Sequence, residues 1–283
     1  MDTNSNQARR VVIGITAHVD AGKTTLAEAM LYRTGRLRKL GRVDHGSAAM
    51  DSHLLERERG ITIFSSQAEL PIGDLEVTLL DTPGHVDFSA EMERTLSVLD
   101  YAILVISGAD GVQAHTRTLW RLLELYRIPT FLFVTKMDFG RCGRGQMMEH
   151  LRHELGEGCV DFTPADRERR MEQLATCRED ALEVYLDGGE VPDALVRQLV
   201  GRRLVFPCWF GSGLKLEGID EFLEGLARYV EPPVYPETFS ARVFKISHDP
   251  QGKRLTHLKV TGGTLRVRDA ISYGGRQEKA AQL

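Results

Sequence analysis

The chain has 283 residues, 42% of them hydrophobic, and carries a formal net charge of −4. This length allows one large domain or two with a full core, and no apolar run is long enough to cross a membrane. The polar residues 1–9 lack a signal-peptide core and are expected to be flexible. Four cysteines without paired metal-ligand spacing suit a reducing compartment, so we expect a cytoplasmic protein. The acidic balance argues against a protein that wraps bare nucleic acid, and DNA is not expected as a partner.

A phosphate-binding loop is predicted at residues 17–24 (AHVDAGKT), between an apolar strand at 10–16 and an amphipathic helix at 22–33. The N–H groups at the start of a helix have no intrahelical acceptor, and the helix dipole adds partial positive charge, so a phosphate can bind there. Lys23 would reach the terminal phosphates as a catalytic group, and the Thr24 hydroxyl would ligate Mg²⁺. The residues expected to hold the phosphates are His18, Val19, Asp20, Ala21, Gly22, Lys23, Thr24 and Thr25.

A second motif, residues 59–63 (RGITI), ends a polar stretch that begins near Gly35. Thr62 could offer its hydroxyl to Mg²⁺ and its backbone N–H to a γ-phosphate, so a nucleoside triphosphate would order the loop. Taken alone, Thr62 fits an ordinary threonine at the start of a strand. Its position between the phosphate loop and the next motif favours the metal-binding and catalytic role.

The third motif, residues 81–85 (DTPGH), follows an apolar strand at 77–80. Asp81 would hold Mg²⁺, and Gly84, which has no side chain, would let its backbone N–H approach the γ-phosphate. His85 stands where a side chain could orient an attacking water, which makes it the candidate catalytic residue. The alternative is a surface histidine that caps a helix; the position directly after 81–84 favours catalysis.

Base recognition is predicted at residues 135–138 (TKMD), after a strand at 131–134. The Asp138 carboxylate can accept hydrogen bonds from N1–H and the exocyclic amine of guanine, which adenine cannot supply. Lys136 would lie along the base, and the Thr135 hydroxyl would make contacts that support the loop. After a strand at 204–210, the turn containing Ser212, Gly213 and Leu214 would present backbone N–H groups to the guanine carbonyl.

Together these motifs resemble the GTPase part of the translation factors, from Arg10 to near Asp269. Segments 17–25, 59–63 and 81–85 match the motifs of that group residue for residue. Segments 54–60, 96–100 and 110–116 resemble the tetracycline ribosomal-protection proteins, and they are also similar to elongation factor G. The chain departs from the ribosomal-protection pattern at Thr135 and Gly213, where asparagine and alanine would be expected.

The resemblance implies a GTPase with GTP or GDP and Mg²⁺ as cofactors and the ribosome, through its RNA and proteins, as activator and partner. It also implies an apolar gate of Val19 and Ile61 beside His85, and a monovalent cation near Asp20. The motifs contain no internal arginine finger, so we expect slow hydrolysis by the isolated, monomeric chain. The favoured function is ribosome-stimulated GTP hydrolysis that protects against tetracycline. A translocase like elongation factor G and a nucleotide switch without turnover are the alternatives.

Apolar strands alternate with helical patterns up to residue 230, which predicts an α/β fold with a mostly parallel sheet and helices on both faces. With the motifs and the resemblance, residues 10–230 are expected to form a P-loop GTPase domain. Helices are expected at 87–97, 116–126 and 218–229, and in a charged insertion at 140–203 whose clearest helix is 167–186. A proline-rich linker at 231–237 precedes a predicted hairpin of strands 239–246 and 255–260. By the resemblance, residues 238–283 form the start of a β-barrel second domain. This length is too short for a whole barrel, so we expect a fragment of a longer protein.

Two charged clusters lie outside these motifs. The basic residues within 36–42, together with Arg57 and Arg59, could contact ribosomal RNA or could keep a solvated loop off the core. His150, His153 and Glu154 could bind a metal, but a solvated face is favoured on a charged helix.

Overall fold

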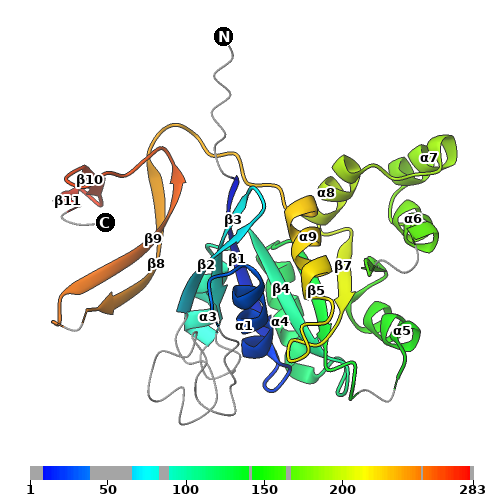
Figure 1. Cartoon of the computed structure of the whole chain (residues 1–283). Helices are drawn as coiled ribbons and strands as arrows, with labels where there is room; N and C mark the ends of the chain where they lie inside the picture. Colours follow the sequence, from blue (N-terminus) through cyan, green and yellow to red (C-terminus); the bar gives the residue numbers. More distant parts are fainter. Residues whose placement is uncertain are drawn as a thin grey trace. The chain divides into compact units, whose positions relative to one another are not determined.

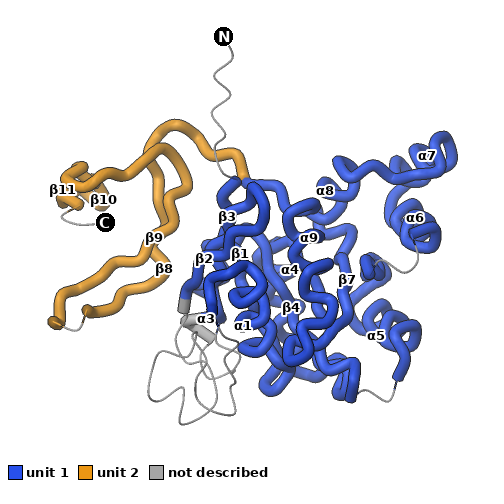
Figure 2. The backbone as a smooth tube through the Cα atoms, in the orientation of Figure 1, with its two compact units in different colours: residues 1–232 blue, residues 233–283 orange. Residues whose placement is uncertain are grey.

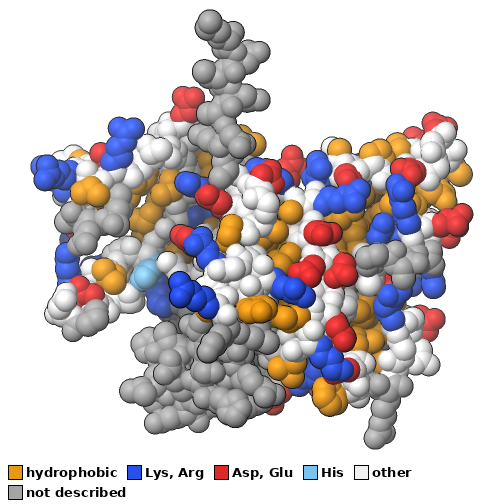
Figure 3. Space-filling model, viewed as in Figure 1, with side chains coloured by type: hydrophobic (Ala, Val, Ile, Leu, Met, Phe, Trp, Pro, Cys, Tyr) orange, Lys and Arg blue, Asp and Glu red, His pale blue; other side chains and the backbone are white. Residues whose placement is uncertain are grey.

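The computed structural model describes residues 9–38, 66–82, 89–139, 142–163, 167–249 and 251–280. The chain divides into two compact units, residues 1–232 and 233–283, drawn in blue and orange in Figure 2. On the face seen in Figure 3, acidic and basic side chains are interspersed. No helix in the described ranges is long and apolar enough to cross a membrane.

In its described residues, the first unit is built on a seven-stranded sheet with the order β2-β3-β1-β4-β5-β7-β6 (Figure 1). Every neighbouring pair is parallel except β2 and β3, so the predicted mostly parallel sheet is confirmed. The carboxyl ends of the parallel strands meet at one edge. The strands are β1 (Arg9–Ala17), β2 (Ser66–Ile72), β3 (Leu75–Asp81), β4 (Tyr101–Ser107), β5 (Thr130–Thr135), β6 (Cys159–Asp161) and β7 (Phe206–Phe210).

Helices cover both faces of this sheet, as predicted. On β5, Phe131 and Phe133 join one core cluster with α1 and α9, whereas Leu132 and Val134 join a second cluster with α4 and α5. A strand buried on both faces requires such a continuous apolar run. The helices are α1 (Lys23–Arg33), α3 (Ser89–Leu96), α4 (Ala114–Leu125), α5 (Arg144–Leu155), α6 (Arg167–Thr176), α7 (Glu179–Gly188), α8 (Asp193–Gly201) and α9 (Ile219–Tyr229).

The predicted elements of the nucleotide-binding half are confirmed with small shifts at their ends. The predicted helices are α1, α3, α4 and α9, and the predicted strands are β1, β3, β5 and β7. The central strand β4 and both edge strands, β2 and β6, lie outside the predicted set. β6 has only three residues, too few to show a period in the sequence.

The prediction of one helix over 167–186 is wrong, because the segment is broken into α6 and α7. Arg178, at the N-cap of α7, has an extended backbone with φ −163° and ψ 149°. A single helix of that length would extend about 30 Å and carry its second half away from the sheet. The break lets Leu174 of α6 and Ala181 of α7 enter the same core cluster.

The second unit begins as the predicted hairpin. β8 (Ser240–His248) and β9 (Arg254–Gly262) pair antiparallel, with an irregularity between Val243 and Lys245. The Gly252 N–H donates to the Asp249 carbonyl at 2.9 Å and closes the turn. A second antiparallel pair, β10 (Ala270–Tyr273) with β11 (Arg276–Lys279), follows.

The contact between α9 and β7 generates a stability prediction. A Cβ built on Gly225 would lie 2.2 Å from Cζ2 of the buried Trp209. Gly225→Ala should therefore lower the free energy of unfolding by about 1–3 kcal/mol through overpacking, measured by urea denaturation. Gly188→Ala is the control, because no atom lies within 4 Å of its added Cβ. Equal stabilities of the two variants would contradict this view of the interface.

Candidate nucleotide site

The loop between β1 and α1 has the backbone geometry of a phosphate-binding turn. Asp20 has φ 61°, and Gly22, which caps α1, has φ 91°, a conformation that favours glycine. The Ala21 N–H donates to the His18 carbonyl at 3.1 Å, and the helix ladder starts with Leu26 N–H to Gly22 O at 2.9 Å. The first turn of α1 contains no acidic residue, so no carboxylate of this turn can accept hydrogen bonds from the N–H groups at the helix start.

The end of β5 holds this loop in place. The buried Thr135 hydroxyl lies 2.5 Å from the Ala21 carbonyl and 3.2 Å from the Ile106 carbonyl. The Lys136 ammonium donates to the Asp20 carbonyl at 2.6 Å. The motif at 135–138 and the loop at 17–24, far apart in sequence, are therefore joined by direct hydrogen bonds.

Asp81 lies beside the same loop because of the strand register. β1 pairs with β3 so that Ile15 faces Asp81, and the Thr82 hydroxyl donates to the Ile15 carbonyl at 2.9 Å. The Asp81 side chain is 1% exposed and forms an ion pair with the Lys23 ammonium, which also donates to the Thr82 carbonyl at 2.7 Å. A buried carboxylate and a lysine therefore meet at the start of α1, where Thr24 and Thr25 also lie.

Asp138 is held by a residue that the motifs do not include. The Lys215 ammonium lies 2.9 Å from Asp138 Oδ2. Its hydrogen bond lowers the pKa of the Asp138 carboxyl and in turn raises the pKa of Lys215. Asp138 is thus kept ionised, the state in which both oxygens accept hydrogen bonds.

The turn after β7 packs against the first turn of α1. Ser212 and Glu217 close it with reciprocal backbone hydrogen bonds of 3.0 Å. A Cβ on Gly213 would lie 3.1 Å from the Thr25 carbonyl, so an alanine here would require a small shift. Leu214, between Gly213 and Lys215, is 52% exposed. The turn therefore places Ser212 and Gly213 next to α1 and the Lys215 ammonium within contact of Asp138.

His18 has an aromatic neighbour on α4. The rings of His18 and His115 have centroids 5.9 Å apart and are tilted by 55°.

His150, one of the residues considered as a metal ligand, accepts a hydrogen bond from the Val112 N–H at 3.1 Å and so fixes α5 to the loop before α4. No cluster of three metal-ligating side chains occurs within the residues that the structure describes.

The structure brings together only part of the predicted site. Hydrogen bonds join Thr135 to Ala21 and Lys136 to Asp20, and an ion pair joins Lys23 to Asp81. Asp138 lies beside the turn at 212–217 through its contact with Lys215. Gly84, His85, Ile61 and Thr62 lie outside the described residues. Lys215 was missed. The signal for Lys215 was its place directly after the three residues predicted to contact the base.

A phosphate loop tied by hydrogen bonds to the TKMD segment at the end of β5, on a mostly parallel sheet, defines a P-loop nucleotide-binding domain of the GTPase class. The comparison with known families agrees. The chain belongs to the family described as the elongation factor Tu GTP binding domain, which matches residues 8–232.

The chain is also similar to longer resistance proteins. It is 39% identical to the oxytetracycline resistance protein of Streptomyces rimosus, over 92% of this chain and 43% of that protein. It is 34% identical to the tetracycline resistance protein TetM from transposon Tn916 of Enterococcus faecalis, over 94% and 44%. A crystal structure from Thermus thermophilus superimposes with a TM-score of 0.85 at 27% identity, covering 96% of this chain and 48% of that one. The chain thus spans less than half the length of these relatives.

The hydroxyl of Thr135 generates a binding prediction. Thr135→Val keeps the shape but removes the donor to the Ala21 carbonyl. We expect GDP affinity to fall about tenfold, the cost of a lost buried hydrogen bond, measured by calorimetry. Thr135→Ser, which keeps the hydroxyl, should stay near wild type. A valine variant that binds GDP normally would show that the hydroxyl does not position the loop.

The Lys215–Asp138 pair generates a pH prediction. A carboxyl whose pKa is lowered in the folded state stays ionised above that pKa and loses its charge as the pH falls through it. Lys215→Met should raise the pKa of Asp138 toward its ordinary value, so protonation begins at a higher pH than in wild type. Carboxyl-carbon NMR on the protein without nucleotide measures this, with Lys215→Arg as the charge-preserving control. Identical titrations of wild type and Lys215→Met would refute the assigned cause.

Proposed function

We propose that this chain is the GTP-binding and GTP-hydrolysing part of a ribosome-associated translation factor. The observation that carries the proposal is the pair of hydrogen bonds from Thr135 and Lys136 to the phosphate loop. It couples the position of Asp138, which would read guanine, to the loop that would hold the phosphates. A loop that merely joined a strand to a helix would need no such tie.

The residues of the loop fit a triphosphate with Mg²⁺. The start of α1 offers N–H groups, and Lys23 adds a positive charge. Asp81 and the Thr24 hydroxyl are oxygen ligands of the kind that Mg²⁺ prefers. Asp81 and Thr24 would hold Mg²⁺, which would supply positive charge to offset the negative charge that develops during phosphoryl transfer. On GTP binding, Lys23 would exchange part of its contact with Asp81 and the Thr82 carbonyl for phosphate oxygens.

The catalytic roles follow from sequence position and family resemblance. His85 orients the attacking water, Thr62 contacts Mg²⁺ and the γ-phosphate, and Gly84 lends a backbone N–H. Val19 forms the apolar gate with Ile61, and Asp20 contributes to a monovalent-cation site.

Asp138 gives the test of base specificity. Asp138→Asn exchanges an acceptor oxygen for an NH₂ donor, which matches the 2-carbonyl of xanthine instead of the 2-amine of guanine. We expect the preference for GDP over xanthosine diphosphate to reverse, measured by competition binding. Thr135→Ser, treated in the same way, should keep the guanine preference. An unchanged preference in the asparagine variant would count against the assignment of Asp138.

The names of the relatives support resistance to tetracyclines as the biological role, and we propose that it acts by ribosomal protection. The proteins from Streptomyces rimosus and Enterococcus faecalis carry resistance in their names and match nearly the whole of this chain. We infer that the complete protein acts in the cytoplasm, uses GTP hydrolysis on the ribosome and releases the drug, and that the isolated chain is a monomer.

The experiment has two arms. The first compares GTP turnover with and without ribosomes for wild type and His85→Ala; we expect a loss of at least about 100-fold in the stimulated rate, typical of a lost catalytic group, with GDP affinity unchanged. The second, with the full-length protein, measures release of labelled tetracycline from ribosomes. Equal ribosome-stimulated rates for wild type and His85→Ala would show that His85 has no catalytic role. Stimulated turnover without drug release would point to a translocase, and GTP binding without turnover would point to a switch.

A further inference from the structure

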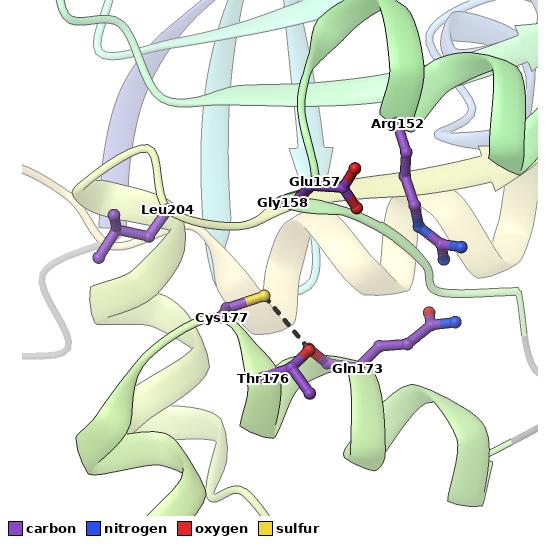
Figure 4. Close-up of a pocket in the computed structure, with 7 residues that line it drawn as sticks. All are labelled: Arg152, Glu157, Gly158, Gln173, Thr176, Cys177 and Leu204. Atoms are coloured by element: carbon purple, nitrogen blue, oxygen red, sulfur yellow. Dashed lines mark hydrogen bonds between the residues drawn. The ribbon is translucent and has the colours of Figure 1, made fainter.

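The helical insertion contains two adjoining cavities that the nucleotide motifs do not reach. Their volumes are 400 and 330 Å³, and both are lined by Arg152 of α5 and Gln173 of α6. Figure 4 shows the smaller one, with the side chains of Arg152 and Gln173 drawn from facing helices. Both helices pack on β6, which lies between them in the sequence. We name the two together the insertion cavity.

The larger part of the insertion cavity carries an excess of positive charge. Its charged lining residues are one carboxylate, Asp161, and four arginines, Arg144, Arg152, Arg169 and Arg170, which leaves three positive charges in excess. The carboxylate is already used within the protein: Asp161 pairs with Arg144 at 2.9 Å and accepts the Thr163 N–H at 2.9 Å.

The smaller part is close to neutral. Glu157 is the carboxylate opposite Arg152 there. Burial raises the pKa of Cys177 to about 11, so this thiol stays uncharged at neutral pH. The excess positive charge is thus concentrated in the larger part.

Two buried polar atoms of the lining lack partners. Arg170 Nε and Thr163 Oγ1 are buried without a hydrogen-bond partner among the described residues. The guanidinium of Arg170 is otherwise fixed, since Nη1 donates to the Phe162 carbonyl at 3.3 Å and Cζ lies 5.5 Å from the centroid of the Phe162 ring. Buried polar groups are nearly always paired, so each of these two atoms calls for a partner.

We propose that the insertion cavity binds a phosphate group, either free phosphate or the phosphodiester backbone of RNA. Guanidinium groups match phosphate oxygens in bidentate geometry. The arginines come from both α5 and α6, and a tetrahedral phosphate can accept hydrogen bonds from both sides, whereas a planar carboxylate cannot do so equally well. A cavity of 400 Å³ also has room for the sugar next to the phosphate.

The test uses the full chain saturated with GDP and Mg²⁺, so that the phosphate loop is occupied. Inorganic phosphate is titrated against sodium chloride at matched ionic strength, and the Arg170 Nε–H resonance is followed by ¹H–¹⁵N NMR. A single-stranded RNA oligonucleotide is titrated in parallel, and its binding is followed by the same resonance and by fluorescence anisotropy. We expect phosphate and RNA to shift the Arg170 resonance, and chloride to leave it in place. A shift with phosphate alone identifies free phosphate as the ligand.

Three variants separate a built site from general surface charge. Arg169→Gln should weaken binding about tenfold, whereas Arg167→Gln should change it by at most about twofold, because Arg167 lies on the same helix but pairs with exposed Glu190 and does not line the cavity. Thr163→Val removes the buried hydroxyl without changing the charge and should also weaken binding. GDP affinity should stay constant in all three.

Several outcomes would overturn the proposal. Equal losses in Arg169→Gln and Arg167→Gln, or normal binding by Thr163→Val, would reduce it to nonspecific charge attraction. An acidic peptide of matched charge that binds as tightly as RNA and shifts the same resonance would show that the class of ligand is wrong. An unmoved Arg170 resonance with both ligands would exclude the cavity altogether.

Discussion

The nucleotide site depends on the hydrogen bonds between the end of β5 and the phosphate loop. The loop contains Asp20 at φ 61°, and the strand end contains Lys136 at φ 56°; both non-glycine residues are in the left-handed region. Such conformations cost on the order of 1–3 kcal/mol each and persist only where the surroundings enforce them. Here the Lys136 ammonium donates to the carbonyl of Asp20 itself, so the two strained residues hold each other. Loop shape and strand end are therefore one structural unit, although 116 positions separate them in the sequence.

The register and order of the strands in the sheet determine which other residues lie beside the phosphate loop. Because the register of β1 and β3 sets Ile15 opposite Asp81, the acidic residue arrives beside the loop with its side chain already buried. A buried carboxylate requires a partner, and Lys23 provides it. The same parallel order brings the turn after β7 onto the first turn of α1, where Gly213 lies against Thr25. The alanine expected by resemblance at position 213 would require its neighbours on Thr25 to move slightly. The glycine found there avoids this steric conflict.

Sequence reasoning succeeded where structure is local and failed where it depends on tertiary geometry. The unit of β1, turn and α1 was predictable because its parts are contiguous, and β5 because burial on both faces imposes an apolar run. The equally buried β4 was not predicted, although it carries the same signal. The pairing of Lys215 with Asp138 depends on a turn closed by Ser212 and Glu217, which no period in the sequence reports. The break between α6 and α7 was missed because no glycine or proline marks it. The positions of Thr62, Gly84 and His85 lie outside the described residues, so their roles rest on the sequence and on family membership.

Thr135 shows how the chain meets a structural need with a different side chain. A hydroxyl has one hydrogen to donate, so it cannot serve the carbonyls of Ala21 and Ile106 at full strength together. The shorter distance, 2.5 Å against 3.2 Å, assigns the donor to the loop. An asparagine amide could donate twice and accept as well, and so could hold more than one neighbour. With threonine, Lys136 supplies the second bond to the loop through Asp20. The loop is thereby fixed at two successive carbonyls, Asp20 and Ala21, which is sufficient to define its path into α1.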